Sequence, residues 1–74
     1  MAPTLLTNSI RRLRFENGEM TQQDLAERVG VTRQTVNAIE AGKYSPSLEV
    51  AFRIAEVFGV RVDEVFHYAP RPKR

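Results

Sequence analysis

The chain lacks cysteine and contains a single histidine, His67. Disulfides and thiolate metal sites are therefore excluded, and one histidine cannot form a metal site or catalytic centre alone. No apolar run approaches the roughly 20 residues that a membrane span needs, and residues 1–7 lack the apolar core of a secretory signal. We therefore expect a cytoplasmic protein with no cofactor, no metal and no membrane partner.

The chain is also short and poor in catalytic groups. Its 74 residues can build one domain with a modest core, because burial in so small a domain leaves little stability to spare. It has no phosphate-binding glycine loop, and its adjacent Asp63 and Glu64 are explained by a favourable interaction with a helix dipole. No set of side chains could position a reacting group, so we do not expect an enzyme.

Charge is nearly balanced, with 11 Lys and Arg against 9 Asp and Glu, so net charge identifies no partner. The last six residues, APRPKR, hold three of the basic residues, and two prolines deny them regular hydrogen bonding. We expect residues 69–74 to form a disordered basic tail that attracts phosphate without regard to base sequence, or simply a solvated terminus. The basic residues that could share one face elsewhere are Arg11, Arg12, Arg33 and Lys43.

The most informative stretch begins at Thr21 and runs TQQDLAERVGVTRQTVNAIEA. Thr21 and Thr32 stand where helix N-caps are preferred, and Gly30 supplies the positive φ that a tight turn needs. This pattern predicts two short helices, over about 22–29 and 33–41, joined by a turn. It is therefore a helix-turn-helix.

Apolar spacing gives each of these two helices a buried face. Leu25, Ala26 and Val29 share one face of the first helix, and Val36 and Ile39 share one face of the second. Ala26 provides the small side chain that two steeply crossing helices need where they touch. The polar residues of the second helix are left facing outward.

Three further helices are expected around the motif, which gives an all-α fold, a compact bundle of about five short helices. The first begins near residues 6–9 and ends at Asn17-Gly18. The second covers about 48–58, and one or two more turns follow over 62–66. The apolar stripes that should face the core are Leu6, Ile10 and Leu13 in the first of these helices, and Leu48, Ala51, Ile54, Ala55 and Phe58 in the second.

The chain resembles the small lambda-repressor-like helix-turn-helix DNA-binding domains of phage repressors and of the xenobiotic-response-element (XRE) type bacterial regulators. The resemblance rests on TQQDLAERVGVTRQTVNAIEAGKYSPSLE and on the later AFRIAEVFGV. Its characteristic spacing runs through Gln22, Ala26, Gly30, Val36 and Ile39. We therefore expect a DNA-binding domain over 8–68, preceded by an arm of residues 1–7.

The resemblance implies that the second helix of the motif enters the major groove of double-stranded DNA. Arg33 offers two parallel donors that match guanine, and Gln34 offers a donor and an acceptor that match adenine. The family also uses the position four beyond Gln34, but Ala38 stands there and offers only a methyl contact. Thr35 and Asn37 could reach a base or a phosphate.

Other positions resemble those with which the family holds the DNA backbone. Gln22 corresponds to a glutamine that bonds a phosphate beside the start of a helix. Lys43 and Tyr44 lie in a loop that grips the backbone, and we group the N-cap Thr32 with them. The alternative is that these polar residues are only the hydrated surface of a small helical protein.

Two further expectations concern contacts that hold the fold and the assembly together. In the family an arginine at the position of Arg14 reaches a glutamate matched by Glu40, so we expect a partly buried ion pair rather than two solvated charges. Such domains usually pair on DNA, so we expect a homodimer. The family dimerises through the region of Val62, Val65 and Phe66. Val65 is the better interface candidate, because the other two could close the monomer core.

Three functions fit this sequence. The first is a sequence-specific DNA-binding transcriptional regulator, and we expect a repressor because 74 residues leave no separate activation or effector domain. The second is an antitoxin or restriction-modification controller with the same motif, which would add a toxin or other protein partner. The third is a helical protein-interaction module without a DNA role, but Arg33 and Gln34 favour DNA binding.

Overall fold

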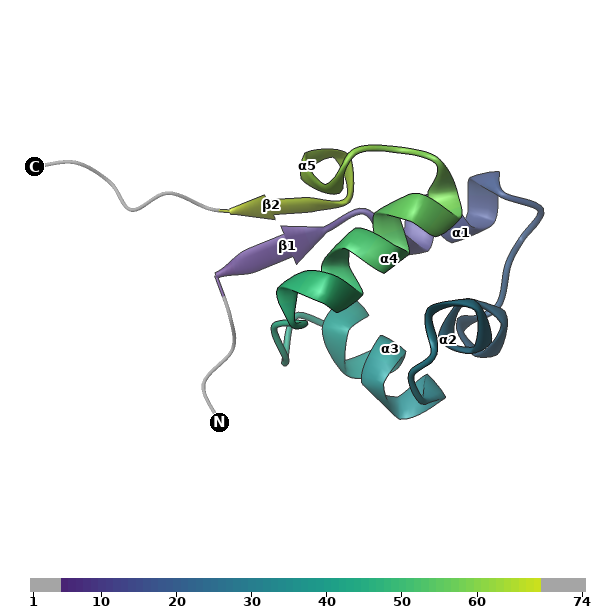
Figure 1. Cartoon of the computed structure of the whole chain (residues 1–74), viewed down its shortest axis with the longest axis horizontal. Helices are drawn as coiled ribbons and strands as arrows, with labels where there is room; N and C mark the ends of the chain where they lie inside the picture. Colours follow the sequence, from purple (N-terminus) through teal and green to yellow (C-terminus); the bar gives the residue numbers. More distant parts are fainter. Residues whose placement is uncertain (1–4, 69–74) are drawn as a thin grey trace, which may run out of the picture.

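The computed structural model describes residues 5–68, in which a short strand, five helices and a second short strand follow one another (Figure 1). The elements are β1 (Leu6–Asn8), α1 (Ile10–Glu16), α2 (Gln22–Val29), α3 (Arg33–Glu40), α4 (Leu48–Phe58), α5 (Val62–Val65) and β2 (Phe66–Tyr68). The expected bundle of five short helices is confirmed. The expected tail, residues 69–74, and most of the expected arm lie outside the described residues.

The two helices of the helix-turn-helix begin at the N-caps that the sequence predicted, Thr21 and Thr32. The Thr21 hydroxyl accepts a hydrogen bond from the Asp24 backbone N–H (3.0 Å), and the Asp24 carboxylate accepts one from the Thr21 N–H (3.2 Å). Thr32 caps α3 by accepting from the Thr35 N–H (3.1 Å). Gly30, with φ +89°, ends α2 in the left-handed conformation. The chain can therefore turn sharply between α2 and α3 without steric cost.

The core lies between the helices and is apolar throughout the described residues. α4 runs through the middle of the fold, with α2 and α3 on one side and α5 and the two strands on the other (Figure 1). Ala26 is 1% exposed, in agreement with the expectation that a small side chain lies where the helices touch. The expectation that Leu48 faces the core is wrong, because this first residue of α4 is 72% exposed. The other buried side chains are Ile10, Leu13, Met20, Leu25, Val29, Val36, Ile39, Ala51, Ile54, Ala55, Phe58 and Val65.

The N-terminal segment differs from the sequence-based expectation. The first helix begins at Ile10 rather than near residues 6–9, and Leu6 does not extend its apolar stripe. Leu6 and Thr7, which we had assigned to an arm, lie in β1. β1 pairs antiparallel with β2, so that Leu6 lies opposite Tyr68. Phe66, expected in a last helical turn, is instead the first residue of β2.

Hydrogen bonds at Asn8 and Ser9 explain why the helix starts late. The side-chain oxygen of Asn8 accepts a hydrogen bond from the Ile10 N–H (3.1 Å), which fixes the start of α1. The Ser9 N–H donates to the carbonyl of Val65 (2.8 Å), at the end of α5. The segment before Ile10 is thus held against the far end of the chain, which closes the two ends of the described structure together. No helix within residues 5–68 is long and apolar enough to cross a membrane.

Candidate nucleic-acid interface

α3 lies at the surface of the bundle and is anchored there by its apolar face. Val36 and Ile39 are 1% and 2% exposed, within the core. Arg33, Gln34 and Asn37 are exposed. These three share one side of the helix, because residues three and four apart are neighbours on a helical surface. The two side chains expected to contact bases therefore point into solvent at the N-terminal end of α3.

Two threonines fix the start of this helix. The hydroxyl oxygens of Thr32 and Thr35 are 2.9 Å apart, and the Thr32 hydroxyl also accepts from the Thr35 N–H. Thr32 is exposed, whereas Thr35 and Ala38 are half-buried. The Thr32 hydroxyl therefore holds the first turn of α3 in place.

A shallow hollow at the N-terminal end of α3 brings Gln22 and Arg33 together. Gln22 is the first residue of α2 and is half-buried, and Arg33 is the first residue of α3. The remaining residues around this hollow are Arg14, Glu19, Met20, Thr21 and Gln23. A candidate backbone contact thus lies beside a candidate base contact.

A second hollow joins Lys43 to the outer face of α3, where it is lined by Gln34, Asn37, Ala38 and Ala41. The loop after α3 makes this approach possible, because Gly42 has φ +75° and turns the chain back. Lys43 is exposed, and Tyr44 is 45% exposed in the same loop.

Arg11 extends the same face from α1. It lines a third hollow with Asn37 and Glu40 of α3, together with Asn8 and Ala41. The sequence had named Arg11 among the cations that could share a face but had given it no role. Arg12, another candidate, lies in an exposed ion pair with Glu16 at 3.5 Å.

The cations next to α3 differ from the other cations in their pairing. Arg12, Arg14, Arg53 and Arg61 each form an ion pair with a carboxylate. Within residues 5–68, no such pair is formed by Arg11, Arg28, Arg33 or Lys43. All of these unpaired cations except Arg28 line the hollows around α3. Three of the four cations without an ion pair in residues 5–68 therefore lie around the exposed face of α3, where they can attract phosphate, and Glu19, which also has no ion pair, lines the same hollow as Arg33.

The Arg14–Glu40 contact is present as a two-pronged ion pair. Arg14 Nε donates to Glu40 Oε1 (3.0 Å), and Arg14 Nη2 donates to Glu40 Oε2 (2.9 Å). The two side chains are only 16% and 14% exposed, so they are not two solvated surface charges. Arg14 Nη1 also donates to the carbonyl of Met20 (2.8 Å). One guanidinium thus links α1, the loop before α2 and the end of α3.

Asn8 is a second support for α3, and the sequence analysis did not identify it. Its side-chain nitrogen donates to the carbonyls of Ile39 (3.1 Å) and Glu40 (3.3 Å). Both carbonyls lie at the C-terminal end of α3, where a helix leaves carbonyls without intrahelical partners. The Ile39 carbonyl also accepts from the Gly42 N–H (3.0 Å), so Asn8 adds a second hydrogen bond there. No local sequence pattern indicates the contact, because Asn8 lies 31 positions before Ile39 and 32 positions before Glu40.

The expectation that Val65 faces a partner chain is wrong. Val65 is 0% exposed, because the single turn of α5 directs it into the core of its own chain. Val62 and Phe66 are half-buried and pack against that core, which was the alternative left open for them. Burial therefore removes only Val65 from the interface candidates, since Val62 and Phe66 keep part of their surface exposed.

Known proteins share this sequence and this fold. The helix-turn-helix family model matches residues 10–65. An uncharacterised HTH-type transcriptional regulator of Methanocaldococcus jannaschii is 57% identical over 49 residues, which cover 66% of this chain and 74% of the relative. The HTH-type regulator YgzD of Bacillus subtilis is 46% identical over 61 residues, which cover 82% and 91% of the two chains.

More distant matches agree with these. The transcriptional repressor RstR of the cryptic phage CTXphi, from Vibrio cholerae, is 34% identical over 82% of this chain and 54% of its own length. The crystal structure of a Bacteroides fragilis protein has the same fold, with a TM-score of 0.71 at 24% identity over 84% of this chain and 98% of that one. The family match spans most of the sequence and includes every residue of α1 to α5. The chain therefore belongs to the XRE-type helix-turn-helix family of transcriptional regulators.

Proposed function

We propose that this protein is a cytoplasmic repressor that binds a defined sequence of double-stranded DNA as a homodimer, with α3 in the major groove. One observation carries the proposal. Arg33 and Gln34 are exposed at the start of a well-anchored helix, and unpaired cations surround that helix. Base-specific groups and phosphate-attracting groups therefore share one surface.

The chemistry of the exposed face fits base edges. An arginine at position 33 can donate two parallel hydrogen bonds to O6 and N7 of guanine, and a glutamine at position 34 can pair with N6 and N7 of adenine. Ala38, one turn further on, can contact only a thymine methyl group. The N-terminal half of α3 would thus supply most of the sequence preference.

The groups on either side of α3 fit the DNA backbone. Gln22 lies at the N-terminus of α2, where unpaired backbone N–H groups favour a phosphate. Lys43 and Arg11 flank the middle and the C-terminal end of α3. Contacts of this kind set the position of a protein on the duplex but do not select a sequence.

Repression follows from occupancy, because a bound protein prevents other proteins from using the same stretch of DNA. The match to a phage protein named as a transcriptional repressor supports this direction of regulation. The proposal requires neither catalysis nor a cofactor. A two-fold operator would double the number of base and phosphate contacts, which is the reason for a homodimer.

Selection from a random pool of DNA duplexes at fixed ionic strength tests the proposal. We expect enrichment of sites with two-fold symmetry, each half containing guanine and adenine at neighbouring positions. The double variant Arg33→Ala, Gln34→Ala should enrich no such sequence while keeping its fold. Failure of the wild-type protein to enrich any duplex would overturn the proposed function.

A further inference from the structure

Glu19 is an acidic residue on the face that the proposed function assigns to DNA. It lines the hollow at the N-terminal end of α3, together with Gln22 and Arg33. It also lines a fourth hollow, which it shares with Arg11 of α1. Glu19 is exposed and forms no ion pair within residues 5–68. A full negative charge therefore lies among the cations around α3.

The backbone fixes the place of this carboxylate. Glu19 has φ +57°, and no other residue except glycine has a positive φ in the described part of the chain. The Glu19 N–H donates to the carbonyl of Phe15 (3.1 Å). The next N–H, that of Met20, donates to the carbonyl of Arg14 (2.9 Å). A side chain is disfavoured in this left-handed conformation, so the fold holds a charged residue where a glycine would be accommodated at lower cost.

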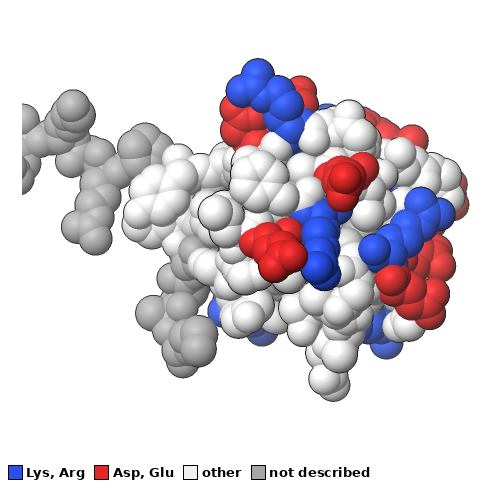
Figure 2. All heavy atoms as spheres, in the orientation of Figure 1, with Lys and Arg blue, Asp and Glu red and all other residues white. Residues whose placement is uncertain are grey.

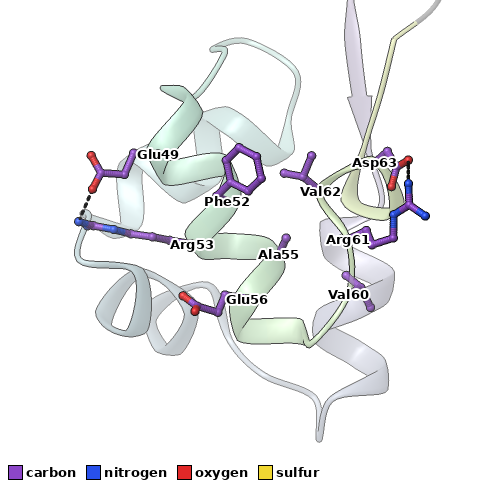
Figure 3. A pocket seen from close by; sticks show the side chains of 9 residues that line it. All are labelled: Glu49, Phe52, Arg53, Ala55, Glu56, Val60, Arg61, Val62 and Asp63. Atoms are coloured by element: carbon purple, nitrogen blue, oxygen red, sulfur yellow. Dashed lines mark hydrogen bonds and ion pairs between the residues drawn. The ribbon is translucent and has the colours of Figure 1, made fainter.

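Most other carboxylates of residues 5–68 have a partner. Basic and acidic side chains lie next to one another on the face shown in Figure 2. In the groove beside α4, Glu49 is paired with Arg53, and Asp63 is paired with Arg61 (Figure 3). Within residues 5–68, only the carboxylates of Glu19 and Glu56 form neither an ion pair nor a hydrogen bond. Of these two, only Glu19 lines a hollow around α3.

A phosphate that enters the hollow at the start of α3 would be attracted by some groups and repelled by another. Gln22 and Arg33 offer it hydrogen-bond donors, whereas the Glu19 carboxylate repels it. Charges act on one another over roughly 10 Å at 0.1 M salt, so the carboxylate can weaken phosphate binding without touching the phosphate. The edge of a guanine base carries acceptors but no net charge. Glu19 therefore opposes a phosphate at Arg33 more strongly than it opposes a base there.

We propose that Glu19 is a specificity-determining residue, which opposes binding of Arg33 to the phosphates of unrelated DNA and so leaves Arg33 for a guanine. The inference rests on the proposed function and deepens it. Binding to unrelated DNA depends almost wholly on phosphate contacts, so repulsion of phosphate lowers the affinity for every such sequence. At the chosen site Arg33 contacts a neutral base, so less affinity is lost. The ratio of the two affinities is therefore larger with the carboxylate than without it.

Binding titrations of the full chain with the selected site and with an unrelated duplex, at one ionic strength, test this inference. Glu19→Gln removes the charge and keeps the size of the side chain. We expect affinity for the unrelated duplex to rise by about threefold, and affinity for the selected site to rise by clearly less. Glu19→Lys changes the charge by two units, so affinity for the unrelated duplex should rise by about tenfold and the slope of log affinity against log salt should steepen by about 1.

Glu56→Gln is the matched control, because it makes the same change of charge at an unpaired carboxylate in the groove beside α4 (Figure 3). It should bind both duplexes as the wild type does. Glu19→Gly separates the charge from the strained backbone. It should raise the melting temperature and yet change the two affinities as Glu19→Gln does. Circular dichroism establishes that each variant is folded.

The results also separate this inference from the proposed function. If the wild type selects a site and Glu19→Gln binds both duplexes as the wild type does, or strengthens both equally, Glu19 does not determine specificity and the proposed function stands. If the wild type selects no sequence but Glu19→Gln binds unrelated duplexes more tightly, Glu19 still opposes phosphate binding and the proposed function fails. If neither the wild type nor Glu19→Lys binds any duplex, both are overturned.

Discussion

Arg14 binds both carboxylate oxygens of Glu40, and Glu40 is the last residue of α3. Asn8 binds the carbonyls of Ile39 and Glu40 at the same end of the helix. The C-terminal end of α3 is therefore held by two side chains from the N-terminal part of the chain. The other end, which begins with Arg33, is exposed. The fold thus sets the orientation of α3 in advance, which the proposed role in reading DNA would require.

The Arg14–Glu40 pair should contribute strongly to stability. Replacing Glu40 with Gln removes one charge of a largely buried pair and leaves the Arg14 guanidinium without its counter-charge. We expect the free energy of unfolding to fall by about 3 kcal/mol, seen as a fall in Tm of more than about 10 °C. Glu49→Gln is the control, because the Glu49–Arg53 pair is 76% and 50% exposed and should contribute less than about 1 kcal/mol. Equal effects of the two substitutions would contradict this interpretation.

Asn8 should stabilise the fold through its amide donors as well as through the start of α1. Asn8→Ala removes both roles and should cost about 1–3 kcal/mol in chemical denaturation. Asn8→Asp keeps an acceptor for the Ile10 N–H but loses the donors to α3 and places a negative charge beside carbonyl oxygens. We therefore expect Asn8→Asp to be at least as destabilising as Asn8→Ala. Wild-type stability of the aspartate variant would show that the contact with α3 contributes nothing.

Arg33 should contribute base preference rather than general affinity. Arg33→Ala should lose about 1–3 kcal/mol of binding to the selected site and relax the preference at one base position. Arg28→Ala removes the same charge from an unpaired arginine on α2 that lines none of the hollows around α3. Binding titrations with every single-base variant of the site should show full discrimination in this control. Loss of discrimination in both variants, or in neither, would argue against a base contact at position 33.

Lys43 should act on phosphate and therefore on all sequences alike. In Lys43→Ala, binding to specific and unrelated duplexes should weaken by a similar factor, and the slope of log affinity against log salt should fall by about 1. Arg12→Ala is the comparison, because Arg12 is already paired with Glu16 on α1. Its salt dependence should match that of the wild type. A change of base preference in Lys43→Ala would place this side chain among the base contacts instead.

The Asp24 carboxylate should stabilise the fold at neutral pH and lose this effect in acid. The pKa of its carboxyl lies below the ordinary 3.8, chiefly because the Thr21 backbone N–H donates a hydrogen bond to the carboxylate, and also because of the Thr21 side chain. The unfolded chain therefore binds a proton more readily than the folded one, so the stabilisation is present above the unfolded pKa and is lost as pH falls through the lowered one.

The difference in unfolding free energy between wild type and Asp24→Asn isolates this effect, since all other carboxyl groups are common to both proteins. The wild-type advantage should be constant at neutral pH and should shrink as the pH falls below about 4. A difference that does not depend on pH in the acid range would exclude the carboxylate as its source.

The helix α3 and its immediate surroundings could be predicted because their causes are local. The caps at Thr21 and Thr32 involve residues three positions apart, and Gly30 acts through its own backbone. Likewise, a period of 3.6 residues is enough to separate the buried Val36 from the exposed Gln34, two positions away on the opposite side of the helix. None of these features needs information from a distant part of the chain.

The late start of α1 and the two-stranded sheet could not be predicted in this way. Leu6 and Ile10 fit a helical stripe, but Ser9 bonds to Val65 and Leu6 pairs with Tyr68. Each of these contacts joins opposite ends of the described chain, and a pattern within a window of a few residues carries no information about such a partner. The same reason explains why the Asn8 support for α3 was missed.

The sequence by itself determined the helices of the motif, the outward face of α3 and the chemistry of Arg33 and Gln34, since helix capping and periodicity act over three or four residues. Tertiary structure alone decided which apolar side chains remain exposed, because burial depends on every element that packs nearby. Val65 and Phe52 are both apolar residues near the C-terminal half of the chain, yet one is fully enclosed and the other is 55% exposed. Only the packed fold could show which of the two is available to another molecule.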